Sequence, residues 1–134
     1  MEKHVINNVQ DSFRKVMPIS EKAAEIFYTK LFEKDPSLKP LFKGDMKEQG
    51  KKLMQMLGMA VNSLNNMGIL LPLLQDLGRK HLSYGITNEM YDTVGASLIE
   101  TLEAGLGADF TSDVKRSWEQ VYNSVAAIMQ KAAS

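Results

Sequence analysis

The spacing of the apolar residues is the strongest constraint on the fold, because they recur every three or four positions along most of the chain. Near the start, Val5, Val9, Phe13 and Val16 follow this rule. Side chains spaced in this way lie on one face of an α-helix. No stretch alternates apolar and polar residues for long enough to indicate a β-strand. The pattern therefore predicts an all-α fold.

Proline, glycine and capping residues divide the pattern into separate helices. We expect Ser20, Asp45 and either Thr87 or Asn88 to cap the helices that follow them, and Gly85 to stand just after the end of another. The sequence predicts helices over about residues 5–17, 20–34, 46–66, 72–81, 88–105 and 112–130, with a single helical turn over 36–42.

The size and composition of the chain narrow the function classes. The 134 residues fit one domain, to which we assign residues 1–134. The chain has no cysteine, which excludes a disulfide scaffold and a thiolate metal site. Sixteen basic and sixteen acidic residues cancel, so nucleic acid is not an expected partner. Neither a signal peptide nor an apolar run of about eighteen residues is present, and we expect a cytoplasmic protein without a membrane span.

His81 lies at the end of a leucine stripe. Leu77, Leu74, Leu73 and Leu70 precede it by four, seven, eight and eleven positions, so a helix would place all five side chains on one face. An imidazole on an apolar face needs a partner, which is either a hydrogen-bond acceptor of the protein or a metal ion. The periodicity alone leaves both possibilities open and favours the ordinary core histidine.

Most other kinds of active site find no support in the sequence. Ser83 is two positions from His81, and residues two apart do not face each other on a helix. No phosphate loop, dinucleotide fingerprint or zinc pattern is present. Haem, by contrast, requires only one strong protein ligand, because the porphyrin supplies four nitrogens to the iron. It also requires an apolar slot between helices, which these helices can supply.

Several residues stand at informative distances from His81. Phe42, which follows Pro40-Leu41, precedes it by thirty-nine positions, and Gln49 precedes it by thirty-two. With Tyr28 and Leu53 these residues give a pattern that resembles a globin, and specifically a bacterial single-domain haemoglobin of the flavohaemoglobin-like branch. The resemblance covers nearly the whole chain and includes further strings, namely Phe27 to Phe32, Lys80-His81, Tyr91 to Gly95, and the pair Trp118 and Tyr122.

This resemblance implies a globin fold, a three-on-three sandwich of six to eight helices around haem b (iron protoporphyrin IX). His81 would be the iron ligand, and Tyr28 and Gln49 would form the polar pair on the distal side. The alternatives are that the Tyr28 hydroxyl donates to a backbone carbonyl and that Gln49 turns to solvent. Lys80 would pair with a haem propionate or remain a surface charge. The residues implied to contact the haem are Phe42, Leu53, Leu77, Lys80, His81, Ile86, Tyr91, Val94 and Leu98.

The function implied by the resemblance is reversible, high-affinity binding of O2 for storage or transport, with NO and CO as further ligands. The alternative is nitric oxide dioxygenation with electrons from an unidentified reductase, since the chain carries no reductase domain. In the flavohaemoglobin-like branch a glutamate late in the last helix supports the proximal histidine. Here that position falls on Ala133, and no carboxylate follows Glu119. This departure favours oxygen binding over peroxidase-like chemistry. His4 lies near the terminus, so we expect no second histidine on the iron.

Overall fold

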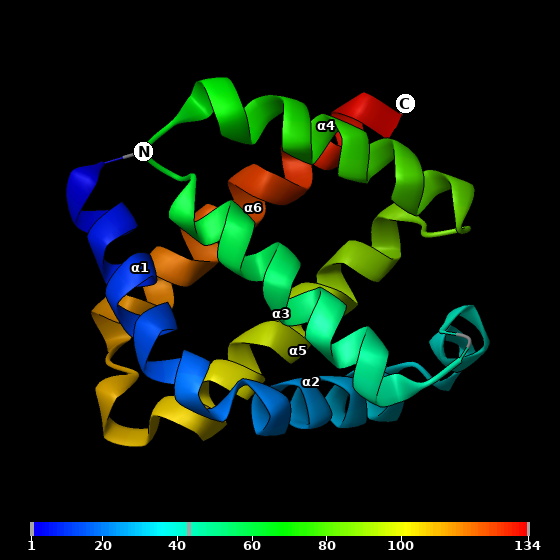
Figure 1. Cartoon of the computed structure of the whole chain (residues 1–134), viewed down its shortest axis with the longest axis horizontal. Coiled ribbons are helices and arrows are strands. Elements are labelled where there is room, and N and C mark those ends of the chain that lie inside the picture. Colours follow the sequence, from blue (N-terminus) through cyan, green and yellow to red (C-terminus); the bar gives the residue numbers. More distant parts are fainter. Residues whose placement is uncertain (1, 43, 134) are drawn as a thin grey trace.

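The computed structural model describes residues 2–42 and 44–133, and Met1, Lys43 and Ser134 lie outside the described residues. Every regular element of the described part is a helix, which confirms the predicted all-α class. The α-helices are α1 (Lys3–Val16), α2 (Ser20–Lys34), α3 (Met46–Asn62), α4 (Met67–Ser83), α5 (Asn88–Leu106) and α6 (Ser112–Ala133), as Figure 1 shows. Short 3-10 helices lie between them: η1 (Met17–Ile19), η2 (Pro36–Leu41) and η3 (Gly107–Asp109).

The helices form two crossing layers. In Figure 1, α1, α3 and α4 run across the side nearest the viewer, and α6 passes behind them. The most extensive contact between two helices joins α4 to α6, and α6 also packs on α1 and α5. On the other side of the molecule α2 lies between α3 and α5 and packs on both. Helix α6 therefore supports α4, and α2 supports α3.

Two glycines allow these supporting helices to approach closely. A Cβ atom at Gly50 of α3 would lie 2.9 Å from the Cβ of Ala24 in α2. A Cβ atom at Gly78 of α4 would lie only 2.2 Å from the carbonyl oxygen of Met129 in α6, which is far inside van der Waals contact. Helix axes can come this close only where a side chain is missing, so Gly78 sets the position of α4 on α6.

A polar link within the core joins α1 to α6. The indole Nε1 of Trp118 donates a hydrogen bond of 2.8 Å to the hydroxyl of Ser12, and both residues are buried. The Ser12 hydroxyl in turn donates to the carbonyl of Asn8 at 2.7 Å. A buried Trp N–H normally needs such a partner. Around this link the core is apolar, and its most completely buried side chains include Val9, Leu31, Leu38, Leu70 and Leu74.

Most of the predicted capping sites are confirmed. Asp45 stands before α3, and its carboxylate accepts a hydrogen bond of 2.9 Å from the backbone N–H of Lys47. Thr87 is the residue that precedes α5. The prediction for Ser20 is wrong, because Ser20 is already the first residue of α2 and Ile19 occupies the capping position. The reason is local, since the η1 turn leads directly into α2.

The predicted boundary between the third and fourth helices is also wrong. Helix α3 ends at Asn62 and not near residue 66, because the chain turns back with a tight bond of 2.9 Å from the N–H of Asn66 to the carbonyl of Ser63. Helix α4 begins at Met67, so Pro72 lies inside it and not at its start. Pro72 is exposed, and the carbonyl that its ring leaves without a helical partner belongs to exposed Gly68.

Candidate functional site

The imidazole of His81 is held in a defined orientation by its own helix. Its Nδ1 lies 2.6 Å from the carbonyl oxygen of Leu77, one turn earlier in α4. A carbonyl only accepts hydrogen bonds, so Nδ1 must carry the proton. In a neutral imidazole the other nitrogen, Nε2, then presents a lone pair. This is the tautomer that a metal-binding histidine needs, with its second nitrogen fixed by a backbone acceptor.

An aromatic ring from α5 lies beside His81. The ring centroids of His81 and Tyr91 are 6.3 Å apart and the rings are inclined by 39°. Tyr91 is buried, and this burial raises the pKa of its hydroxyl above the ordinary value. The carbonyl of His81 accepts a hydrogen bond of 3.0 Å from the N–H of Ile86, which closes the end of α4. The structure thus brings three predicted site residues together at the junction of α4 and α5.

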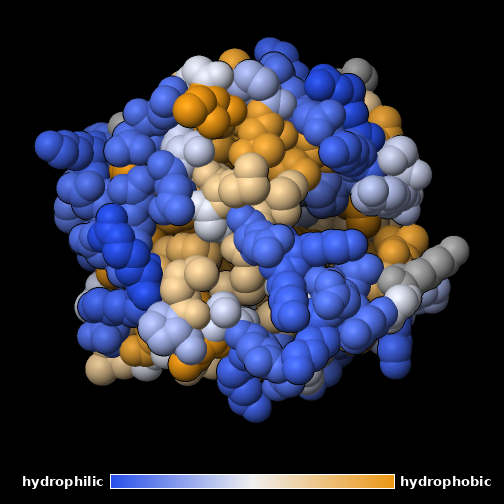
Figure 2. Space-filling view, viewed as in Figure 1, coloured by the Kyte–Doolittle hydropathy of each residue, from blue (hydrophilic) through white to orange (hydrophobic). Residues whose placement is uncertain are grey.

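Further predicted lining residues lie around this junction. Leu98 is buried in α5, whereas Leu77, Ile86 and Val94 are only partly buried and pack on the edge of the core. Figure 2 shows apolar residues at the top of the view and toward its centre and left, and hydrophilic residues over much of the rest of this face. The four lining residues thus come from α4, from α5 and from the turn between them.

Tyr28 lies in an aromatic cluster at the other end of the site. Its ring centroid is 5.3 Å from those of Phe27 and Phe42 and 5.9 Å from that of Phe32. The Tyr28 hydroxyl donates to the backbone carbonyl of Gln49 at 3.3 Å, the alternative that the sequence left open. Burial raises the pKa of Tyr28 to about 12, so the hydroxyl keeps its proton near neutral pH and remains a donor.

The structure also brings the beginning of α3 to this cluster. The N–H of Gln49 bonds to the carbonyl of Asp45 at 3.1 Å, and its side chain is partly buried. Leu53 follows one turn later, is partly buried and packs on the core. Leu53 and Leu98 both line a small apolar cavity of about 20 Å³ that reaches toward Phe27 and Trp118. The Tyr28 hydroxyl therefore meets the backbone of Gln49, and the role of the two side chains as a distal pair stays a prediction.

Lys80 and His4 have partners at the surface. The Lys80 ammonium lies 3.1 Å from the carboxylate of Asp76, one turn earlier, and both side chains are more than half exposed. Its predicted pairing with a haem propionate stays a prediction. His4 Nε2 lies 2.9 Å from the carboxylate of Asp113 in α6, and its side chain is exposed, which agrees with the surface location expected for it. The second histidine is thus tied to the α1–α6 contact and not to the α3–α4 face.

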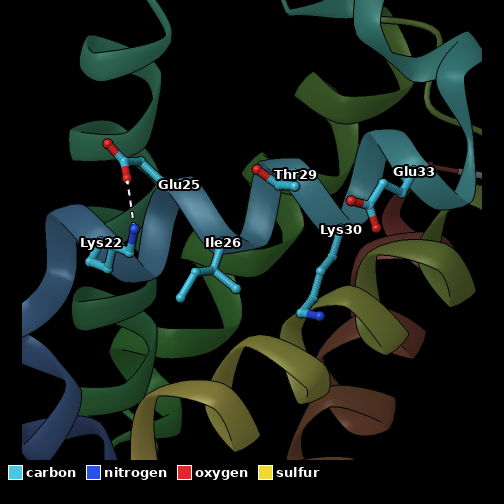
Figure 3. A pocket seen from close by; sticks show the side chains of 6 residues that line it. All are labelled: Lys22, Glu25, Ile26, Thr29, Lys30 and Glu33. Carbon is cyan, nitrogen blue, oxygen red and sulfur yellow. Dashed lines mark ion pairs between the residues drawn. The ribbon is translucent and has the colours of Figure 1, made fainter.

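Another hollow, of about 310 Å³, lies on the outer face of α2 and is separate from His81. Its lining side chains all come from α2, and Figure 3 shows the ion pair between Lys22 and Glu25, which measures 3.7 Å. This hollow is open to solvent and offers no histidine. Within residues 2–42 and 44–133, no group of three or more His, Asp or Glu side chains is arranged to hold a metal ion. No helix in the same described part is long and apolar enough to cross a membrane.

The residues around His81 fit a haem by their chemistry. One imidazole nitrogen is available as a strong ligand, which is all that the iron of a porphyrin requires from the protein. The side chains at the border of the site are aromatic or aliphatic and only partly covered by the rest of the protein, as the flat apolar faces of a porphyrin require. Leu77, Ile86 and Val94 are such side chains near the junction of α4 and α5, and Phe42, beside Tyr28, and Leu53, on α3, are further ones.

One residue near this site had no predicted role. Tyr122 of α6 donates a hydrogen bond of 2.5 Å from its hydroxyl to the backbone carbonyl of Tyr91. In the sequence, Tyr122 contributed with Trp118 to the globin resemblance and received no role at the site. A signal was present in Gly95, four positions after Tyr91, because a glycine inside a helix often marks a close contact.

Comparisons with known proteins bear on the family of this chain. The profile of the family described as Globin matches residues 25–129. Neuroglobin of Danio rerio is 31% identical over 120 residues, a match covering 79% of this chain and 76% of the relative. Neuroglobin of Dissostichus mawsoni is 29% identical over the same shares of the two chains.

A comparison with solved structures supports the predicted fold. The crystal structure of a hexacoordinated heme protein from an anhydrobiotic tardigrade matches with a TM-score of 0.89, over 99% of this chain and 95% of that chain. At 18% identity, this likeness bears on the fold alone. The fold predicted from the sequence is confirmed by this match and by the helices described above.

Proposed function

The chain belongs to the globin family, and on this premise we propose that it binds haem b through His81 and holds O2 reversibly beside Tyr28 and Gln49. The observation that carries the proposal is the 2.6 Å bond from His81 Nδ1 to the carbonyl of Leu77, which leaves Nε2 as a ligand. Haem, when bound, supplies an iron at which a diatomic gas can bind. The protein supplies the ligand, the apolar surroundings and the hydrogen-bond donors.

The distal donors act on the gas molecule. The Tyr28 hydroxyl is already held by a bond of 3.3 Å to the Gln49 carbonyl, which is long for an O–H donor and therefore weak. Rotation about the C–O bond lets the same hydroxyl turn toward a ligand without moving the ring, which Phe27, Phe32 and Phe42 hold in place. The Gln49 amide supplies a second N–H donor. Donors that are held in place before the ligand arrives lose little entropy when it binds.

The absence of a distal histidine predicts the state of the iron. Gln49 occupies the distal position, and His4 is engaged with Asp113 at the α1–α6 contact. The term hexacoordinated describes the tardigrade protein, and we propose a different state here, in which ferrous iron has His81 as its only protein ligand. The absorption spectrum of the dithionite-reduced protein should be of the five-coordinate high-spin type. A six-coordinate low-spin spectrum would contradict the proposal.

Reconstitution tests the proposal directly. Apoprotein titrated with haemin should develop a sharp Soret band at one equivalent, and the reduced protein should bind and release O2 reversibly. His81→Ala serves as the matched variant, since it removes the ligand and leaves the apolar surroundings. If the wild type and His81→Ala take up haemin with equal affinity, His81 is not the ligand. Absence of any Soret band in the wild type would refute haem binding altogether.

Nitric oxide dioxygenation is the second candidate, because the same distal pair suits it. In that reaction O2 and NO yield nitrate, and an external reductase must return the iron to the ferrous state. The last helix carries no carboxylate after Glu119 that could increase the basicity of His81, and this favours ligand binding over turnover. Steady-state consumption of NO with a reductase supplied separates the two functions. Consumption that stops after one equivalent excludes the dioxygenase.

The position within the family rests on a few residues. Tyr28, Gln49 and Tyr91 support placement in the flavohaemoglobin-like branch, and the missing late carboxylate is a departure from it. The relatives reported above are vertebrate neuroglobins and a tardigrade protein. Membership of that branch, a bacterial source and a cytoplasmic location therefore stay predictions from the sequence.

A further inference from the structure

A methionine sulfur accepts a hydrogen bond at the start of α5. The backbone N–H of Thr87, the residue before the helix, donates a bond of 3.4 Å to the Sδ atom of Met90 in the first turn. The N–H of Met90 in turn bonds to the Thr87 carbonyl at 3.1 Å. In the capping box of other helices a Glu or Gln oxygen accepts the first of these bonds. A thioether is a weak acceptor, and its chemistry changes when it is oxidised.

This sulfur closes the turn that follows His81. Residues 84–87 separate α4 from α5. Within them, the N–H of Ile86 donates to the His81 carbonyl at 3.0 Å, and the next N–H, that of Thr87, donates to the Met90 sulfur. Two consecutive N–H groups therefore tie the turn to the end of α4 on one side and to the start of α5 on the other. A change at the sulfur acts one residue away from the bond to His81.

A small oxidant can reach the Met90 sulfur. The hydrogen bond between Thr87 and Met90 lies at the surface, and Thr87 is exposed. The Met90 side chain is only partly buried, at the edge of the core. Met54 and Met129, by contrast, are each only 8% exposed. Exposure favours the oxidation of a sulfur-containing side chain, so Met90 should react before these two.

We propose that Met90 is a site of reversible oxidation, at which hydrogen peroxide converts the capping thioether to a sulfoxide and thereby opens the turn between α4 and α5. The O–O bond of the peroxide breaks, one oxygen forms the S–O bond, and the other leaves as water. The sulfur loses two electrons and the peroxide gains them. Methionine sulfoxide reductases reverse such a modification. Only the effect on haem retention rests on the proposed function.

The sulfoxide does not fit the present arrangement. With 3.4 Å between the Thr87 nitrogen and the Met90 sulfur, there is no room for an oxygen atom between them. The sulfur must therefore withdraw, and its new polar oxygen is poorly placed beside the apolar core on which Met90 packs. The N–H of Thr87 then turns to water. The turn over residues 84–87 loses one of its two ties, and the bond from Ile86 to the His81 carbonyl remains.

Peptide mapping tests the modification. Trypsin should release residues 81–115, in which Met90 is the only methionine, and residues 117–131, in which Met129 is the only one. Hydrogen peroxide should add one oxygen atom to the first peptide well before the second, both in the apoprotein and in the reduced, CO-bound protein. Treatment with methionine sulfoxide reductases should remove it. Oxidation of Met90 no faster than that of Met129 overturns the proposal.

Hydrogen exchange tests the effect on the turn. Amides of residues 86–90 should exchange faster after peroxide treatment of the wild type. Met90→Leu keeps the volume and lacks the acceptor, so these amides should exchange fast from the outset and show no further change. Met90→Gln supplies an amide oxygen to Thr87, so exchange should stay slow before and after treatment.

Met59→Leu is the matched control, because Met59 is 52% exposed on α3, away from this turn. This variant should respond to peroxide as the wild type does. If Met90→Leu responds as strongly as the wild type, another residue causes the change and the proposal fails.

Haem transfer to an acceptor apoprotein measures the consequence for His81. Oxidation should make transfer about two- to fivefold faster in the wild type, as expected for the loss of one weak hydrogen bond, and should leave Met90→Gln unchanged. An equal rate in protein whose Met90 is fully oxidised contradicts the link from the turn to the haem site. A wild-type protein without a Soret band would refute the proposed function instead. Mapping and exchange of the apoprotein would then still decide whether Met90 is oxidised and whether the turn opens.

Discussion

Replacing Tyr28 with phenylalanine should release O2 from the reduced protein markedly faster. The variant keeps the ring contacts with Phe27, Phe32 and Phe42 and removes only the hydroxyl. A hydroxyl that donates to a ligand with developing negative charge contributes about 1.5–3 kcal/mol. In the free protein the same hydroxyl first leaves the Gln49 carbonyl, and that 3.3 Å bond is worth only about 0.5 kcal/mol at the weak end of the scale.

The difference between these two terms sets the expected magnitude. The net contribution of the hydroxyl is about 1–2.5 kcal/mol, which corresponds to a dissociation rate about five to seventy times faster in Tyr28→Phe. Most of this effect should fall on dissociation, because the mutation leaves the entry of a small gas unchanged. Stopped-flow displacement of O2 by excess CO measures the rate directly, and Tyr84→Phe is the control for the loss of an exposed hydroxyl.

An unchanged rate would refute this reasoning. If Tyr28→Phe releases O2 within twofold of the wild-type rate, the hydroxyl stays on the Gln49 carbonyl when the gas is bound, and Tyr28 is only a core aromatic. The free energy of unfolding of the apoprotein measures the strength of the bond between the Tyr28 hydroxyl and the Gln49 carbonyl. This free energy should fall by no more than about 1 kcal/mol in Tyr28→Phe, because the variant loses only one long hydrogen bond.

Three other perturbations have distinct expected results. Gly78→Ala should lower the free energy of unfolding of the apoprotein by about 1–3 kcal/mol in urea titration, because its Cβ would lie 2.2 Å from the Met129 carbonyl oxygen. Gly68→Ala, in the same helix, is the control, because its Cβ would meet its nearest atom at 3.4 Å, and it should be neutral or mildly stabilising. Burial raises the pKa of Tyr28 from 10.0 to about 12, so the folded state keeps a proton that the unfolded chain loses in this range. The stability that the protonated Tyr28 hydroxyl gives the folded state is fully present below pH 10 and is lost toward pH 12. Urea titrations at rising pH should therefore show the free energy of unfolding falling more steeply in the wild type than in Tyr28→Phe. His81→Ala should weaken haem binding by more than the ten- to hundredfold typical of losing an outer-shell partner, and added imidazole should restore part of it in haemin titrations.

Much of the fold could be predicted from local spacing. The helices were placed correctly in kind and order because a period of three to four residues is a property of neighbouring side chains. The errors fell at the ends of helices, where the geometry of a local turn decides at which residue a helix begins or ends. Pro72 indicated a helix start, yet α4 begins five residues earlier because the Met67 turn is closed by bonds from Ile69 and Leu70 to the Asn66 carbonyl.

The candidate site shows the same division. The leucine stripe located His81 and left its partner open, and the globin resemblance named the residues around it. The structure then placed Tyr91 against the imidazole and Tyr28 at the start of α3. The sequence left two possible roles for Lys80, and both stay predictions. In the structure Lys80 lies beside Asp76, and a long exposed side chain can exchange partners at little cost.

The sequence by itself determined the all-α class, the leucine face that ends at His81, and the exclusion of cysteine chemistry, because each of these is a local pattern or a count. Only the tertiary structure decided where the Tyr28 hydroxyl points and how Tyr122 reaches Tyr91. The physical reason is distance along the chain. Gly78 and Met129, or Tyr91 and Tyr122, meet only after the helices have packed, and a contact of this kind leaves no periodic trace in either segment.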